Sequence, residues 1–189
     1  MPDHFTKVFE SDYFLVEQSN KKYDNNDSYY RINEKDSIIC CVLDQLDRFI
    51  LVEQNRPAIG LLTLEFPAGQ IENNEQPLAS AEREFYEETS LYAKMSCVGK
   101  FSIMPNRSTS QAYGFFGFTE NNGTKKMHGI KVLEIKRGEL EEIILSGKFQ
   151  HMAGLAVLKA AELYFEFNIF NDKLSDIEES FTKSKINKD

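Results

Sequence analysis

Three glutamates of this chain, Glu84, Glu87 and Glu88, are spaced so that their carboxylates could act together. Pro77, a residue favoured in the first turn of a helix, precedes them, and the apolar residues after it recur at helical spacing. Positions i, i+3 and i+4 of a helix share one face, where like charges repel each other. Arg83 neutralises only part of this charge. A divalent cation would neutralise the rest, and Mg²⁺ is typically held by one or two carboxylates together with substrate phosphates.

The same helix carries an apolar stripe of Leu78, Ala81 and Phe85, which we predict to be buried. At 3.6 residues per turn, the stripe is centred roughly 100° from the three carboxylates. The acidic face would then lie beside the core contact, at the rim of a cleft. A solvated acidic helix surface is the alternative interpretation of such a run of glutamates.

The residues around the glutamates favour a functional interpretation, because they resemble the Nudix box. That motif is a glycine, five residues, a glutamate, seven residues and then R-E-U-x-E-E-x-G-U, where U is apolar. The matching residues are Gly69, Glu75, Arg83, Glu84, Phe85, Glu87, Glu88 and Leu91. The sequence is therefore identified as a member of the Nudix hydrolase superfamily. Ser90 stands where the family has glycine, and a left-handed serine there would cost on the order of 1 kcal/mol without affecting metal ligation.

Segments before the box extend the resemblance. Residues 51–56 and 64–69 look like the V-x-Q-x-R and L-E-x-P-A-G preamble of the ADP-ribose pyrophosphatase branch, which also includes hydrolases of other nucleoside diphosphate sugars. The resemblance covers residues 37–165. It implies the Nudix fold, an α/β/α sandwich with a mixed β-sheet, here with additional N-terminal strands.

The resemblance also implies roles for individual residues. Glu84, Glu87, Glu88 and the backbone carbonyl of Ala68 would bind Mg²⁺, with Mn²⁺ as a substitute. Glu87, Glu88 and Arg83 would be the catalytic residues, with Arg83 orienting the glutamates rather than touching substrate.

Two residues of the preamble, Arg56 and Glu65, are candidates for substrate binding. The guanidinium of Arg56 offers planar, multidentate donation, which suits a phosphate or a ribose. The alternative for Arg56 is an exposed surface arginine before Pro57.

The identity of the catalytic base stays open. Relatives of this branch often supply a glutamate from a late loop, which corresponds here to residues 121–129 and contains no acid. Glu120 precedes this loop and His128 lies within it, and either could act as a base through water. Glu87 or Glu88 of the box could serve instead.

The composition of the chain disfavours several other classes of protein. The net charge of −8, from 22 Lys and Arg against 30 Asp and Glu, disfavours broad binding to nucleic acid. The longest apolar run, residues 38–43, is far shorter than the roughly 18 residues of a membrane helix, and no secretory signal is visible. The three cysteines lack C-x-x-C spacing and fit a reducing cytoplasm better than a disulfide framework or a zinc site.

The order of the expected elements indicates an α+β fold. Periodicity and turn signals predict strands over 13–16, 29–32, 37–43, 48–53, 62–66, 92–104, 111–119 and 131–135, and helices from Pro77, over 139–145 and over 150–165. We divide the chain into N-terminal strands that dimerise (1–36), a Nudix hydrolase domain (37–168) and a polar C-terminal tail (169–189), which would be a loose helix or disordered.

The function implied by the resemblance is Mg²⁺-dependent cleavage of the diphosphate of an ADP-ribose-like nucleoside diphosphate sugar. The products would be a nucleoside monophosphate and a sugar phosphate. Alternative substrates are GDP-mannose, a dinucleoside polyphosphate or a nucleoside triphosphate. A sensor that binds a nucleotide sugar without cleaving it is the alternative from another class, and the acid-free loop is the main point in its favour. We expect a cytoplasmic homodimer.

Overall fold

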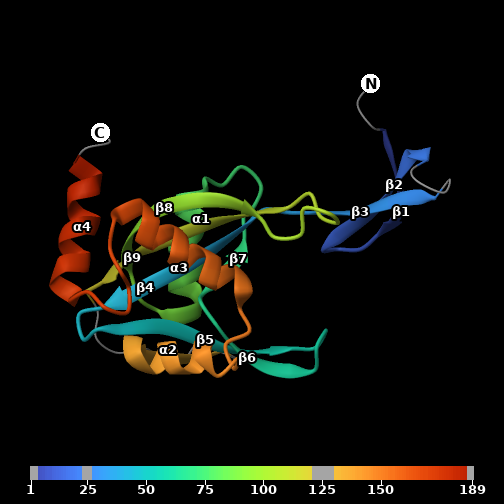
Figure 1. Cartoon of the computed structure of the whole chain (residues 1–189). Helices are drawn as coiled ribbons and strands as arrows, with labels where there is room; N and C mark the ends of the chain where they lie inside the picture. The colour runs from blue at the N-terminus through green and yellow to red at the C-terminus, as the bar shows by residue number, and fades with distance from the viewer. Residues whose placement is uncertain (1–3, 23–26, 121–129, 187–189) are drawn as a thin grey trace.

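The computed structural model describes residues 4–22, 27–120 and 130–186. Its first part is a small antiparallel sheet in the order β1-β2-β3, formed by β1 (Phe5–Glu10), β2 (Phe14–Lys22) and β3 (Ser28–Glu34). The strands β2 and β3 are longer than the sequence predicted, and β1 was not predicted. Figure 1 shows this sheet projecting from one end of the molecule, away from the C-terminal helix.

The main sheet has seven strands: β4 (Ser37–Asp44), β5 (Arg48–Arg56), β6 (Leu61–Glu65), β7 (Ala68–Gln70), β8 (Ala93–Ser102), β9 (Gln111–Thr119) and β10 (Lys131–Lys136). Five of them run in the order β10-β5-β4-β9-β8, while β6 pairs with β5 and β7 pairs with β4. The pair β4–β9 is parallel and the other pairs are antiparallel. The sheet is therefore mixed, as expected.

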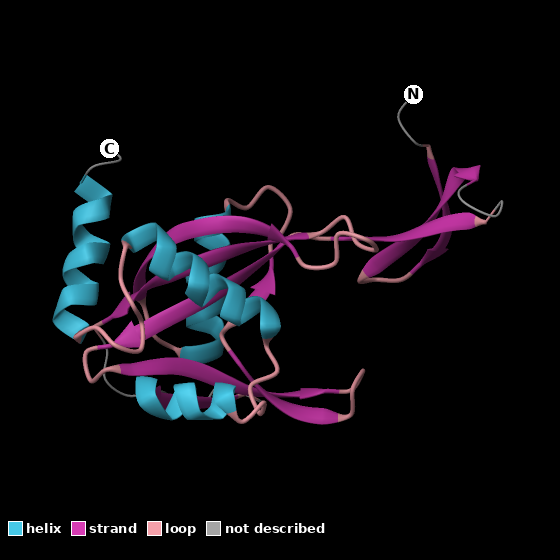
Figure 2. Ribbon diagram, viewed as in Figure 1, coloured by secondary structure: helices cyan, strands magenta, loops and turns pink. Residues whose placement is uncertain are grey.

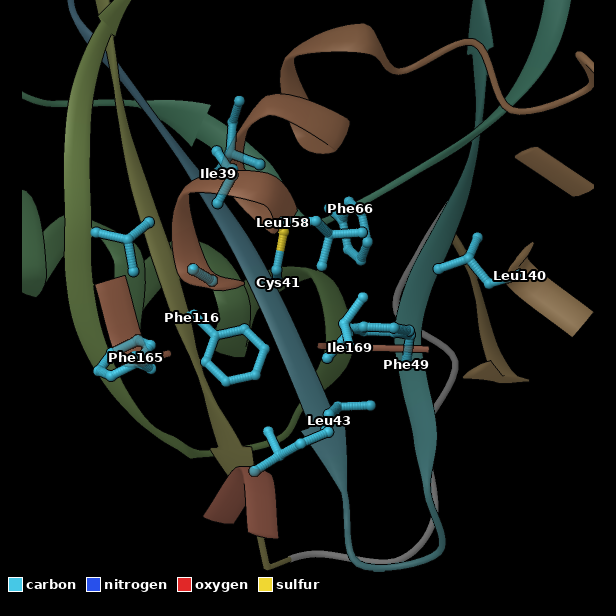
Figure 3. Packing of buried hydrophobic residues seen from close by; sticks show 14 of the residues in the cluster. Ile39, Cys41, Leu43, Phe49, Phe66, Phe116, Leu140, Leu158, Phe165 and Ile169 are labelled. Atoms are coloured by element: carbon cyan, nitrogen blue, oxygen red, sulfur yellow. The ribbon is translucent and has the colours of Figure 1, made fainter. Parts of the chain in front are cut away.

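Helices cover both faces of this sheet, because side chains of the buried strand β4 alternate between the two faces. Ile38, Cys40 and Val42 pack on the side of α1 (Pro77–Thr89). The other side faces α3 (Met152–Phe165), and its core residues include those labelled in Figure 3. The remaining helices are α2 (Arg137–Leu145) and α4 (Leu174–Ile186). The result is a helix–sheet–helix sandwich, the expected architecture (Figure 2).

The buried faces of two helices differ from the predicted ones. In α1, Ala81 and Phe85 are fully buried as predicted, but Leu78 is 43% exposed because it lies in the first turn, beyond the edge of the core. The apolar spacing within residues 150–165 predicts a buried side made of Ala153, Ala156, Val157, Ala160, Ala161 and Tyr164, but in α3 Ala156 and Tyr164 are exposed. The helix instead buries Gly154, Val157, Leu158, Ala161 and Phe165.

The end of the chain is more ordered than predicted. The helix α4 buries Ile177 and Phe181, and Ile169 before it is also buried in the core on the α3 side. Phe181 packs against Phe165 with ring centroids 5.3 Å apart. Within the described part of α4, Asp176, Glu179 and Lys183 are exposed, so the helix is amphipathic.

Ser90 ends α1 in the left-handed conformation that the sequence suggested, with φ 59° and ψ 23°. Its backbone N–H donates to the carbonyl of Tyr86. Because glycine adopts this conformation without the penalty from Cβ, Ser90→Gly should raise the free energy of unfolding by about 1 kcal/mol. Urea unfolding measures the change, and an unchanged or lower value would contradict the assignment of strain to Ser90.

Candidate functional site

The main sheet splits beneath α1, and the split creates the site. At one end of β4, Leu43 pairs with Phe49 of β5. Toward its other end, β4 pairs instead with β7, so that Ile39 lies opposite Ala68, while β5 pairs with β6. The helix α1 contacts β4, β5 and β7. The acidic face of α1 therefore meets the short strand that carries Ala68 and Gly69.

Gly69 lies directly against the carboxylate of Glu84. A Cβ atom added to Gly69 would lie 2.1 Å from Cδ of Glu84, far inside van der Waals contact. This close approach of backbone and carboxylate explains why the first position of the motif requires glycine. The contact with Gly69 also restricts the positions that the Glu84 carboxylate can occupy.

Glu88 is the most buried of the three glutamates, with 7% of the residue exposed. Its Oε1 accepts a hydrogen bond of 2.8 Å from Nε2 of Gln54, and its Oε2 accepts one of 3.2 Å from the N–H of Ala68. Burial raises the pKa of Glu88 to about 7, the charge of Glu84 adds to the rise, and the two hydrogen bonds oppose it. This carboxylate is costly to keep ionised without a cation.

The raised pKa of Glu88 predicts how the stability of the metal-free protein depends on pH. The folded protein binds this proton more tightly than the unfolded chain, in which the pKa is about 4.5. The free energy of unfolding should therefore fall by up to about 3 kcal/mol as the pH rises from about 4.5 to 7. Glu88→Gln should remove this fall, because glutamine keeps the shape without the charge. Urea unfolding in EDTA at several pH values gives the difference between the two proteins, and parallel pH profiles would contradict the assignment.

Arg83 holds the remaining acids of the motif in place. Its Nε and Nη2 each donate a 2.9 Å hydrogen bond to Glu75, and its Nη1 donates to Glu84 at 2.7 Å and to Glu87 at 3.2 Å. The hydrogen bonds from Arg83 lower the pKa of Glu75 to about 2. Arg83 thus links Glu75, Glu84 and Glu87, and its part in catalysis stays a prediction.

The donors at this site suit a hard divalent cation. Glu84, Glu87 and Glu88 supply oxygens only, and one oxygen each of Glu84 and Glu87 takes no part in the ion pairs with Arg83. The N–H and C=O of an extended residue point to the same side, so the Ala68 carbonyl also faces Glu88. Across the described ranges, no three acidic, histidine or cysteine side chains already converge on one point. Binding an ion would therefore draw these carboxylates together.

Arg56 and Glu65 form the second part of the site, on β5 and β6. Arg56 donates from Nε to Oε1 of Glu65 at 2.7 Å and from Nη2 to Oε2 at 2.5 Å, and Thr63 donates to Oε1 at 2.6 Å. Burial raises the pKa of Glu65, but the hydrogen bonds from Arg56 and Thr63 outweigh it, and the net shift is downward. The Arg56 side chain remains 44% exposed. Glu65 thus holds the Arg56 side chain in place. Direct contact of Glu65 with substrate stays a prediction.

Comparison with known proteins identifies the family. A sequence profile of the NUDIX domain matches residues 34–159, which is most of the chain. The chain belongs to the Nudix family. A segment of 40 residues is 60% identical to an ADP-sugar pyrophosphatase of Mus musculus and spans 21% of this chain and 18% of that protein. The chain thus matches less than a fifth of the curated relative's length.

The Nudix fold is also seen in a solved structure described as an ADP compounds hydrolase. The two chains superpose with a TM-score of 0.69 over 88% of this chain and 95% of that one, at 15% sequence identity. That similarity establishes the architecture alone. Within the part of the chain that the structure describes, every helix is too short or too polar to cross a membrane.

Of the candidate bases outside the Nudix box, Glu120 is the one that the structure describes. Glu120 forms an exposed ion pair of 3.0 Å with Lys94. It follows Thr119, which pairs with Asp44 at the end of β4, whereas Ala68 pairs with Ile39. Five residues of strand separate the two levels, roughly 16 Å at about 3.3 Å per residue. His128 lies outside the described residues.

Two contacts around the candidate site were not found by the sequence analysis. Gln54 lies in the V-x-Q-x-R preamble, so the motif itself could have indicated its contact with Glu88. His151 accepts a 3.1 Å hydrogen bond at Nδ1 from the N–H of Phe66. It is 85 residues away from Phe66 along the chain, and the spacing carries no signal for this contact.

Proposed function

We propose that this protein hydrolyses the diphosphate of a nucleoside diphosphate sugar of the ADP-ribose type in a reaction that requires Mg²⁺, with Mn²⁺ as a substitute. The observation that carries the proposal is the position of the α1 carboxylates: Glu88 accepts from the N–H of Ala68, Glu84 lies against Gly69, and Arg83 bonds to both Glu84 and Glu87. A cation that prefers oxygen ligands would find its donor atoms there, and such a cation also binds the oxygens of a substrate diphosphate. The resemblance to an ADP-sugar pyrophosphatase over 40 residues supports the choice of substrate class.

The residues of the chain divide the work of such a reaction. A bound divalent cation would neutralise phosphate charge and polarise a P–O bond. Glu84, Glu87, Glu88 and the carbonyl of Ala68 would hold it, and Arg83 would keep the carboxylates in position. Arg56 would present its exposed donors to phosphate oxygens, because Glu65 fixes one edge of the planar guanidinium.

The proton of the attacking water would pass to a carboxylate of the box, Glu87 or Glu88. Both belong to the proposed cation site, whereas Glu120 follows Thr119 at the other end of the strands, where it forms an exposed ion pair with Lys94.

A panel of substrates tests the proposal. ADP-ribose, other nucleoside diphosphate sugars including GDP-mannose, a dinucleoside polyphosphate and nucleoside triphosphates are incubated with the protein and Mg²⁺ or Mn²⁺, and products are separated by chromatography. We expect a nucleoside monophosphate and a sugar phosphate from ADP-ribose-like substrates. Preferred cleavage of another class would replace the substrate assignment. Binding without turnover for the whole panel would favour the sensor instead.

We also propose a cytoplasmic homodimer whose interface includes the N-terminal sheet. The sheet and the turn between β1 and β2 expose Phe9, Tyr13 and Tyr30, apolar surface that a second copy of the chain would cover. Light scattering at micromolar concentration should give the mass of two chains, and deletion of residues 1–34 should give an aggregating or inactive protein. A mass of one chain refutes the dimer. The free cysteines Cys40, Cys41 and Cys97 fit a reducing compartment.

A further inference from the structure

Three backbone groups of residues 66–68, the segment that leads into β7, form hydrogen bonds to three different elements. The N–H of Phe66 donates to Nδ1 of His151 at the start of α3. The carbonyl of Pro67 accepts a 2.8 Å hydrogen bond from the N–H of Cys40 in β4. The N–H of Ala68 donates to Glu88 in α1. The second and third hydrogen bonds restrain the same peptide, Pro67–Ala68, and the bond to His151 restrains the Glu65–Phe66 peptide, with the Phe66–Pro67 peptide between the two.

The N–H of Phe66 needs an acceptor, because Phe66 is fully buried and follows the last residue of β6. A buried backbone donor without a partner is costly. The next residue, Pro67, has no N–H of its own, so the neighbouring donors that could stiffen the turn are Phe66 and Ala68. The His151 ring is itself held near the rings of Phe66 and Phe149, with centroids 6.4 Å away from each.

The peptide that His151 binds joins the two parts of the site. Its carbonyl belongs to Glu65, which holds Arg56 through two hydrogen bonds. Its N–H belongs to Phe66, two residues before Ala68. The Phe66 ring is already fixed in the core, edge-on to Phe49 at 5.4 Å (Figure 3). The ring therefore fixes the position of the residue, and the hydrogen bond to His151 fixes the orientation of the peptide plane.

We propose that His151 is a positioning residue: its unprotonated Nδ1 orients the Glu65–Phe66 peptide and thereby the Ala68 backbone that faces the metal ligands. The inference rests on the proposed function, because it assumes that Ala68 and Glu88 bind a divalent cation. Burial of His151 lowers its pKa, which keeps the imidazole neutral and able to accept at Nδ1. The space around the ring is also restricted, since a Cβ on Gly154 would lie 3.0 Å from Nδ1 and 2.6 Å from the Phe66 ring.

Titration of the metal-free protein with Mn²⁺, followed by electron paramagnetic resonance, tests the proposal without relying on turnover. His151→Leu removes the acceptor and should weaken Mn²⁺ binding at least about tenfold, as loss of outer-sphere partners of a metal usually does. His151→Asn places an acceptor oxygen where Nδ1 was, at the same number of bonds from Cβ, and should restore most of the affinity. His4→Leu, the same change at an exposed histidine that precedes β1, should leave the affinity unchanged.

The outcomes separate this inference from the proposed function. Wild-type protein that binds no Mn²⁺ would overturn the proposed metal site and the inference with it. Wild-type binding that His151→Leu leaves unchanged, or that His151→Asn weakens as much as His151→Leu, would overturn the inference alone. Should His151→Leu fail to fold, His151→Gln replaces it, because the longer glutamine side chain moves the amide away from Phe66. If His151→Gln then binds Mn²⁺ as tightly as His151→Asn does, the result counts against the proposal.

Nitrogen-15 NMR at pH 8 should also show the His151 proton on Nε2, and a proton on Nδ1 would overturn the assignment.

Discussion

Replacing Glu84 or Glu88 with glutamine is expected to lower kcat at least about a hundredfold. Loss of a residue that only hydrogen-bonds to a metal ligand can already cost up to about a hundredfold, and these two glutamates are the proposed ligands themselves. Each change removes one negative charge from the proposed cation site and keeps the size of the side chain. The fold should persist, because Ala81 and Phe85, which attach α1 to the sheet, are untouched. At Glu88 a glutamine can still accept from the N–H of Ala68, and Gln54 can turn its amide to accept from the new NH₂ group.

A matched control for these variants lies on the same helix. Glu82 is exposed and is not one of the three clustered carboxylates, so Glu82→Gln changes the net charge equally without touching the site. Its kcat should equal that of the wild type. Steady-state kinetics at saturating Mg²⁺ measures all three variants, and near-normal turnover in both Glu84→Gln and Glu88→Gln would show that the site is assigned wrongly.

Much of the main sheet and of the acidic helix could be predicted from the sequence, because the relevant signals are local. The strand β4 is a short apolar run between turn residues, and the position of the helix follows from Pro77 and the spacing after it. The relation of Arg83 to Glu87 is fixed by helical geometry alone, and the structure shows the corresponding ion pair. Local periodicity was sufficient for prediction where all the residues concerned belong to one helix or one strand.

The features that were missed depend on contacts between distant segments. Leu78 has the right spacing for burial, but whether the first turn of a helix reaches the core depends on the length of the sheet beneath it. The burial of Ile177 and Phe181 depends on the end of the sheet that α4 covers. The role of His151 depends on how α3 starts relative to the end of β6, and no spacing along the chain encodes that juxtaposition.

Substituting Gly69 by alanine is expected to produce a similarly large loss of activity for a steric reason. The new Cβ would lie 2.1 Å from Cδ and 2.3 Å from Oε2 of Glu84, while carbon atoms in contact are normally about 3.5 Å or more apart. The backbone of β7 is paired to β4, so the Glu84 carboxylate is the group that moves. A displacement of more than about 1 Å in a catalytic arrangement can cost about a hundredfold in rate.

Stability and activity should separate in this variant, and that separation distinguishes displacement of Glu84 from general disruption. The clash is with the end of a flexible side chain, so Gly69→Ala should lower kcat about a hundredfold while the free energy of unfolding changes by no more than about 1 kcal/mol. The matched control is Gly138→Ala in α2, where an added Cβ meets no atom within 4 Å. That variant should keep wild-type kcat and be slightly more stable, because alanine favours a helix over glycine. Full activity in Gly69→Ala would mean that the Glu84 carboxylate does not work from the position it occupies against the backbone of β7.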